Sequence, residues 1–148
     1  GSGVVPKGFQ AFCKTHPAAC RGGGAHTVKY DAALMAQLKR VNAQVNASIR
    51  PVKSEAGDVW SLNVSKGDCE DYVLAKRRAL INAGVPASAL SIVYALVKGG
   101  QGHAVLGVRT DKGMYVLDNL NKSIRPIGST GYKVISMSGP NPKVWVRA

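Results

Sequence analysis

The chain has 148 residues, of which 45% are hydrophobic and 19% are charged. This length and composition predict a single domain over residues 1–148 with a packed core, and they exclude a disordered chain. The chain has 20 lysines and arginines against 8 acidic residues, a formal net charge of +12, which favours anionic partners.

These basic residues are scattered along the sequence, and neither a zinc-finger spacing nor an aromatic RNA-binding consensus accompanies them. We therefore expect no nucleic-acid partner. No stretch reaches the roughly 18–20 uninterrupted apolar residues that a membrane helix needs. Gly1-Ser2-Gly3 resembles a cloning remnant, so the lack of a leader-like N-terminus does not exclude a signal peptide upstream.

The first half of the chain contains one clear periodic segment. Residues 4–30 show no periodicity and are expected to be irregular, with the run Gly22-Gly23-Gly24 among them. After Asp31, apolar residues recur at spacings of 4, 3, 4 and 4, namely Leu34, Leu38, Val41, Val45 and Ile49. This pattern predicts an amphipathic helix that ends before Pro51.

A second helix is predicted after a loop over residues 51–67. It begins near Cys69, keeps helical spacing, and stops at Asn82-Ala83-Gly84. Acidic residues lie at its start and basic ones toward its end, which suits the helix dipole.

The rest of the chain is predicted to form strands. Five segments are rich in β-branched and aromatic residues and are separated by glycine turns: Leu90–Val97, His103–Val108, Met114–Leu117, Tyr132–Met137 and Val144–Val146. Because the helices come first and the strands follow, we expect an α+β fold in which N-terminal helices pack on a largely antiparallel sheet.

The cysteines divide into a local pair and a single residue. Cys13 and Cys20 are seven positions apart, which favours a disulfide and an oxidising compartment. Two reduced, buried cysteines are the alternative. A structural zinc site has poor spacing, with His16 and His26 as the nearby histidines.

Cys69 has the setting of a nucleophile. A helix N-terminus lowers the pKa of a thiol, although the neighbouring acids Asp68 and Glu70 oppose this. His103 opens a strand after a glycine turn, and Asp118 follows the next strand across a hairpin. An aspartate that accepts from one ring nitrogen would orient the histidine toward the cysteine. Buried or surface residues without catalytic roles remain the alternative at this point.

Longer motifs carry a resemblance to a known family. The blocks are Gly67-Asp68-Cys69-Glu70-Asp71-Tyr72, Lys76-Arg77, His103-Ala104-Val105-Leu106 and Leu117-Asp118-Asn119, with Phe12-Cys13, Pro17, Cys20, Trp60 and Trp145 around them. Taken in order over nearly the whole chain, they resemble the bacterial transglutaminase-like cysteine proteinase family, which includes periplasmic proteases that cut surface adhesins.

The resemblance implies a papain-like, transglutaminase-type core and assigns roles to particular residues. Cys69 is then the nucleophile, His103 the general base and acid, and Asp118 the orienting carboxylate. Some members bind calcium through the acids that flank the cysteine, which correspond to Asp68 and Glu70 here. Calcium prefers carboxylate oxygens, and it would offset the repulsion between these acids and a thiolate.

The sequence therefore predicts a periplasmic or secreted cysteine peptidase, acting as a monomer on a protein substrate such as a surface adhesin. The backbone N–H of Cys69 is one oxyanion donor, and the Trp60 indole is a weaker candidate for a second. Two alternatives stay open. The same residues would serve a transglutaminase or amidase, and a basic domain that kept the fold without activity would bind an anionic surface.

Overall fold

The computed structural model describes residues 5–51, 60–62 and 66–148, so the expected remnant Gly1-Ser2-Gly3 lies outside the described residues. The helical segments are α1 (Lys7–Thr15), η1 (Pro17–Cys20), α2 (Ala32–Ser48), α3 (Cys69–Asn82), η2 (Ala87–Ala89) and η3 (Ile127–Ser129). The strands are β1 (Arg50–Pro51), β2 (Lys66–Gly67), β3 (Leu90–Leu96), β4 (Gly102–Thr110), β5 (Gly113–Leu117), β6 (Arg125–Pro126), β7 (Lys133–Ser138) and β8 (Trp145–Arg147).

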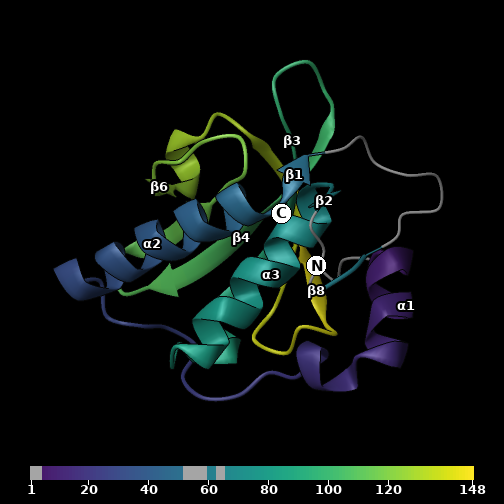
Figure 1. Ribbon diagram of the computed structural model, residues 1–148, viewed down its shortest axis with the longest axis horizontal. Coiled ribbons are helices and arrows are strands. Elements are labelled where there is room, and N and C mark those ends of the chain that lie inside the picture. Colours follow the sequence, from purple (N-terminus) through teal and green to yellow (C-terminus); the bar gives the residue numbers. More distant parts are fainter. Residues whose placement is uncertain (1–4, 52–59, 63–65) are drawn as a thin grey trace.

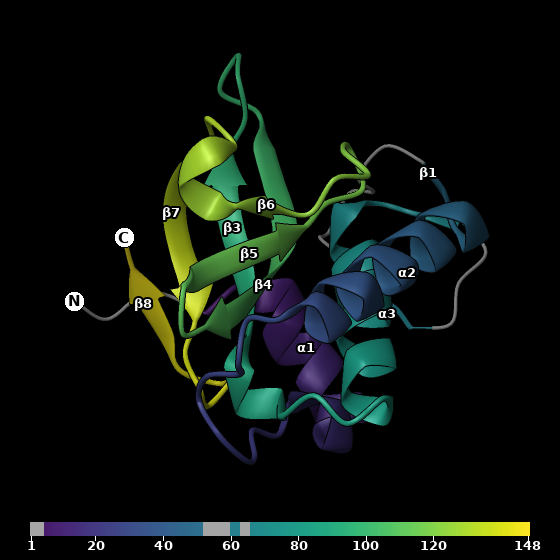
Figure 2. The same ribbon diagram turned by 90° about the vertical axis from the view of Figure 1, so that its left-hand side faces the viewer.

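The architecture is the expected α+β arrangement. Strands β6-β5-β4-β3-β7-β8 form one sheet, in that spatial order, and every neighbouring pair is antiparallel. The helices α1, α2 and α3 cover one face of this sheet (Figure 1, Figure 2). The main core lies between these layers and contains apolar residues from all of them, among them Leu38, Leu80, Ile92, Leu106 and Trp145.

Local signals explain the two longer helices and the central hairpin. Asp31 caps α2 by accepting a hydrogen bond from the Leu34 N–H at 2.8 Å, and Pro51 follows soon after its end. Gly113 has a φ of +102° at the turn between β4 and β5, a conformation that glycine adopts without strain. The sequence places these elements correctly within a residue or two.

The expectation that residues 4–30 are irregular is wrong. They contain α1 and η1, and Phe9 and Phe12 of α1 are almost fully buried. Phe9 packs on the rings of Trp60 and Trp145, with centroid distances of 5.4 and 5.9 Å. A helix this short is marginal on its own, so tertiary packing by two aromatic residues stabilises it, and a periodicity criterion does not detect it.

The loop expected over residues 51–67 also needs correction at its ends. Strands β1 and β2 pair in parallel, with Arg50 opposite Lys66 and Pro51 opposite Gly67. Residues 52–59 and 63–65 lie outside the described residues. The two-residue strands escape detection because a parallel pairing between distant segments leaves no local pattern.

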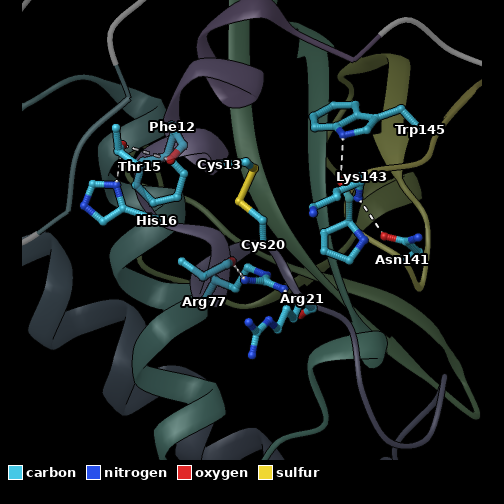
Figure 3. The surroundings of a disulfide bond; sticks show 12 residues. Phe12, Cys13, Thr15, His16, Cys20, Arg21, Arg77, Asn141, Lys143 and Trp145 are labelled. Carbon is cyan, nitrogen blue, oxygen red and sulfur yellow. Dashed lines mark hydrogen bonds between the residues drawn. A yellow bond between two sulfur atoms is a disulfide. The ribbon is translucent and has the colours of Figure 1, made fainter.

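Cys13 of α1 and Cys20 of η1 form a disulfide, with Cα atoms 5.7 Å apart (Figure 3). The same figure shows Arg77 of α3 reaching this segment, where its guanidinium donates to the carbonyls of Ala19 and Arg21. The N-terminal segment is thus fastened to itself covalently and to α3 by hydrogen bonds.

We expect the double replacement Cys13→Ser, Cys20→Ser to lower the free energy of unfolding by about 2 kcal/mol, because the bond closes a short loop. Urea unfolding of both proteins measures this difference. Alkylation of the unreduced protein should modify Cys69 and leave Cys13 and Cys20 unmodified. Modification of Cys13 and Cys20 under those conditions would contradict the disulfide.

Candidate active site

Cys69 is the first residue of α3, directly after the N-cap Asp68. The first N–H groups of a helix have no partner within it, so the Cys69 N–H makes no hydrogen bond within α3. The Cys69 thiol donates to Oε2 of Glu70 at 3.4 Å, and the backbone N–H of Ala104 in β4 is near enough to act on the thiol by lowering its pKa. The thiol is therefore held against the strand, one residue beyond His103.

His103 and Asp118 are joined by a hydrogen bond. His103 Nε2 and Asp118 Oδ1 are 2.8 Å apart, and both side chains are buried, at 5% and 1% exposure. The pairing of Leu106 with Leu117 sets the register of β4 and β5 and brings the start of β4 beside the residue that follows β5. The structure thus joins His103 to Asp118 in a buried pair, and the joint position of Cys69 with this pair stays a prediction.

Asp118 has further partners that the sequence did not indicate. Its Oδ2 accepts from the Tyr132 hydroxyl and lies 3.8 Å from an Arg125 nitrogen. The Leu120 N–H donates to Oδ1 at 2.9 Å. Burial alone would raise the pKa of Asp118, but the hydrogen bonds from His103 and Tyr132 outweigh it and hold the pKa below its ordinary value. Asp118 is therefore ionised.

Tyr132 contacts both His103 and Asp118, and sequence reasoning did not single it out. Its ring meets the His103 ring edge-on, with centroids 5.6 Å apart, while its hydroxyl contacts Asp118. Burial and this contact raise the pKa of Tyr132 to about 12, so the hydroxyl stays a donor. No motif marks Tyr132, because only the fold brings this position, 14 residues along the chain, next to Asp118.

The acids around Cys69 oppose ionisation of the thiol. Burial, followed by the charge of Glu70, raises the pKa of Cys69 to about 12. Burial and a hydrogen bond to Asp68 raise the pKa of Glu70 to about 7, so these two carboxyl groups lie within hydrogen-bond reach of each other. The thiol is therefore protonated at neutral pH in this state.

Asp71 differs from Asp68 and Glu70 because both of its carboxylate oxygens accept hydrogen bonds from backbone N–H groups. Its Oδ1 accepts from the Ser61 N–H at 2.8 Å, and its Oδ2 accepts from the Asp68 N–H at 3.1 Å. The carboxylate therefore ties the start of α3 to residues 60–62. Gly67 leaves room for it, since a Cβ there would lie 2.4 Å from Asp71 Oδ2.

The expected calcium ligands Asp68 and Glu70 meet beside the sulfur. Asp68 Oδ1 is buried and has no hydrogen-bond partner, which is costly unless a cation is bound. Within the described ranges, however, no cluster of three or more His, Cys, Asp and Glu side chains is arranged to hold a metal. Asp68 and Glu70 offer two hard oxygen ligands of the roughly 6–8 that calcium takes.

Trp60, the weaker oxyanion candidate, packs on Phe9 and is 8% exposed. Together with Glu70 and Ala104 it lines a cavity of about 420 Å³.

Among the helices in the part of the chain that the structure describes, none has the length and apolar character of a membrane-spanning helix.

Lys76 lies two turns along α3 from Cys69 and is 1% exposed. Its ammonium lies 5.5 Å from the centre of the Tyr72 ring. Burial lowers the pKa of Lys76 from 10.5 to about 7, against an opposing effect of Asp118. The motif pair Lys76-Arg77 is therefore internal, not part of the basic surface.

The buried amine predicts a pH dependence. The unfolded chain binds the Lys76 proton more tightly, so the contribution of Lys76 to the free energy of unfolding rises between pH 7 and about 10. Lys76→Met should remove this rise, and at pH 7 it should stabilise the protein by about 1–4 kcal/mol. Urea titrations at several pH values measure both effects, with the exposed Lys39→Met as the control. Equal pH slopes in wild type and Lys76→Met would contradict the burial of a neutralised amine.

The comparison with known proteins decides the family. The family model of the bacterial transglutaminase-like cysteine proteinases matches residues 1–148. The chain belongs to this family. The resemblance drawn from its motifs is thereby confirmed, and membership makes the protein a cysteine peptidase with a protein substrate.

Solved structures of LapG from Legionella pneumophila have the same fold. One is 26% identical, with 88% of this chain and 72% of that chain covered and a TM-score of 0.61. A calcium-bound LapG is 24% identical, with 100% and 84% covered and a TM-score of 0.65. A search of curated proteins finds no match.

Proposed function

We propose that the protein is a periplasmic or secreted cysteine endopeptidase that hydrolyses a peptide bond of a surface protein, an adhesin being the expected substrate. The observation that carries the proposal is the buried His103, which is hydrogen-bonded to Asp118 at 2.8 Å, while Cys69 lies at the N-terminal end of α3, the helix that packs on β4. The Cys13–Cys20 disulfide supports an oxidising location.

In the proposed mechanism, His103 takes the thiol proton while the sulfur attacks the substrate carbonyl carbon. The resulting oxyanion is stabilised by the Cys69 N–H at the start of α3, with the Trp60 indole as a second donor. His103 then protonates the leaving amine, which breaks the C–N bond and leaves a thioester. A water molecule, deprotonated by His103, attacks the thioester and releases the acid product and the thiol.

Asp118 orients the base in this scheme. Its hydrogen bond uses His103 Nε2, so the proton resides there and Nδ1 keeps the lone pair that accepts the thiol proton. The ionised carboxylate also stabilises the imidazolium that forms. Tyr132 and Arg125 hold Asp118 on its other oxygen.

We further propose that Asp68 and Glu70 bind calcium. Similarity to a calcium-bound LapG and the unpartnered Asp68 Oδ1 support this, and backbone carbonyls and water would complete the ligands. A bound calcium ion would supply positive charge beside the sulfur and thereby offset the acids that disfavour the thiolate.

Removal of calcium should therefore slow the enzyme. We expect a chelator to depress iodoacetamide labelling of Cys69 and peptidase activity, and calcium but not magnesium to restore both. At 100 times Kd, calcium should stabilise the fold by about 2.7 kcal/mol, seen as a higher melting temperature. Asp68→Asn should abolish these responses. Asp111→Asn is the matched control, because Asp111 lies in the distant β4–β5 turn and its Oδ1 accepts from Tyr30. Calorimetry without heat of calcium binding at millimolar concentration would refute the calcium site and leave the triad standing.

The test of the function is a cleavage profile of secreted and surface proteins, treated with wild type or Cys69→Ala. We expect neo-N-termini in the wild-type sample only, and His103→Ala should slow iodoacetamide labelling of Cys69. Products that incorporate an added amine in place of water would identify acyl transfer. Identical profiles for wild type and Cys69→Ala would overturn the proposal in favour of a binding domain.

A further inference from the structure

Helix α2 carries two asparagines in a row of residues that otherwise packs in the core. The buried row that begins with Leu34 and Leu38 is spaced by four residues. Its next two members are Asn42 and Asn46, and Asn42 is 0% exposed. Asparagine is a poor helix former, because its amide competes with the backbone for hydrogen bonds. Two asparagines one turn apart on this face therefore indicate hydrogen-bond partners outside the helix.

These partners are backbone carbonyls of the loop that joins β5 to β6. Asn46 Nδ2 donates to the carbonyl of Asp118, the first residue after β5, at 3.1 Å. Asn42 Nδ2 donates to the carbonyls of Asn121 and Lys122 at 3.3 and 3.4 Å. Figure 2 shows α2 beside the end of β5. The loop is thus fastened at its first residue and again near its middle, and we call the contacts of Asn42 and Asn46 the α2 clamp.

The chemistry of the contacts fixes the orientation of both amides. The Oδ1 atoms of Asn42 and Asn46 are buried and have no hydrogen-bond partner among the described residues, whereas each Nδ2 faces carbonyl oxygens. A reversed amide would set its oxygen against other acceptors, which cannot donate to it. Each position therefore needs a side-chain donor, which an apolar residue of the same size does not supply.

The α2 clamp acts on the backbone of Asp118, while the contacts described above act on its carboxylate. His103 and Tyr132 bind the carboxylate oxygens, which move with the backbone that carries them. The paired residues of β4 and β5 end with Leu106 and Leu117, so Asp118 lies just beyond the part of the chain that the sheet holds. The Asn46 contact fixes the backbone at this next residue.

We propose that Asn42 and Asn46 are positioning residues of the peptidase, which hold the β5–β6 loop so that the Asp118 carboxylate meets His103 Nε2. The inference rests on the proposed function, which gives Asp118 its orienting role. Neither asparagine touches the substrate in this scheme. Without the clamp the loop is free to shift, and misplacement of a catalytic group by about 1 Å costs up to about 10²-fold in rate.

Asn46→Leu removes the donor to the Asp118 carbonyl and keeps the size of the side chain. On a peptide from the cleavage profile, we expect kcat to fall by about 10-fold with KM nearly unchanged. The double replacement Asn42→Leu, Asn46→Leu should lower kcat by up to about 10²-fold. Asn46→Gln keeps an amide donor and should retain more activity than Asn46→Leu. Gln44→Met is the matched control, because Gln44 is an exposed amide on the same helix, and it should leave kcat unchanged. A wild-type kcat in Asn46→Leu would refute the proposal.

A double-mutant cycle separates positioning from general destabilisation. If Asn46 acts through Asp118, Asn46→Leu should lower kcat much less in an Asp118→Asn enzyme, where the carboxylate is already absent, than in wild type. A merely structural role would lower kcat by the same factor in both backgrounds. Equal factors would therefore overturn the proposal.

The His103 ring supplies a readout that does not depend on catalysis. Its Nε2–H is hydrogen-bonded to Asp118, and NMR of protein with isotope-labelled histidine follows this proton. We expect it to exchange with water about 10-fold faster in Asn46→Leu than in wild type or Gln44→Met. Unchanged exchange would refute the clamp even in an active enzyme. Faster exchange in a protein without Cys69-dependent cleavage would overturn the proposed function and leave the fastening of Asp118 standing, so the two failures are distinguishable.

Discussion

Asp118→Asn is expected to reduce kcat by about 10²–10⁴-fold with little change in melting temperature. The carboxylate accepts a hydrogen bond from His103 Nε2–H at 2.8 Å and so leaves Nδ1 free to accept the thiol proton. An asparagine amide can donate to Nε2 instead, which shifts the ring proton to Nδ1. The base then faces Cys69 with the wrong tautomer, and the imidazolium loses its counter-charge. Steady-state kinetics on a peptide from the cleavage profile measure this loss.

Tyr132→Phe is the matched control for this variant. It removes one donor to Asp118 and keeps the carboxylate, the ring packing on His103 and the Leu120 N–H contact. We expect kcat to fall by no more than about 10-fold, because one lost hydrogen bond to a charged group has a limited effect. An Asp118→Asn enzyme with a kcat near that of wild type would contradict the role given to Asp118.

Gly67→Ala is expected to lower both the stability and the activity of the protein. The new Cβ would lie 2.4 Å from Asp71 Oδ2 and 2.7 Å from Asp71 Cβ, so the carboxylate must move. Overpacking of this kind lowers the free energy of unfolding by about 1–3 kcal/mol. Displacement of Asp71 also breaks its bonds to Ser61 and Asp68, which shifts the start of α3 and costs up to about 10²-fold in kcat.

Urea unfolding and kinetics on the same preparation test both effects of Gly67→Ala. Gly128→Ala is the control, because a Cβ at Gly128 meets no atom within 4 Å. It should leave stability and activity near those of wild type. If Gly67→Ala behaves like Gly128→Ala, the close contact with Asp71 does not constrain the site.

The sequence alone determined the elements that have strong local signals. The apolar spacing and the Asp31 cap located α2, and the glycine turns located β3, β4 and β5. It also singled out Cys69, His103 and Asp118, because a helix start and a hairpin constrain where such side chains can lie. Short elements without a local signal, α1 and the pair β1 and β2, were missed because distant contacts stabilise them.

Only the tertiary structure decided what surrounds Cys69, His103 and Asp118. Tyr132 reaches Asp118, and Asp71 ties Ser61 to the helix start. Each of these contacts joins segments whose separation depends on sheet order and register. Local sequence signals act over one or two turns of chain and carry no information about which strands become neighbours. The sequence therefore located the candidate residues, and the packed sheet set their burial, charge and hydrogen-bond partners.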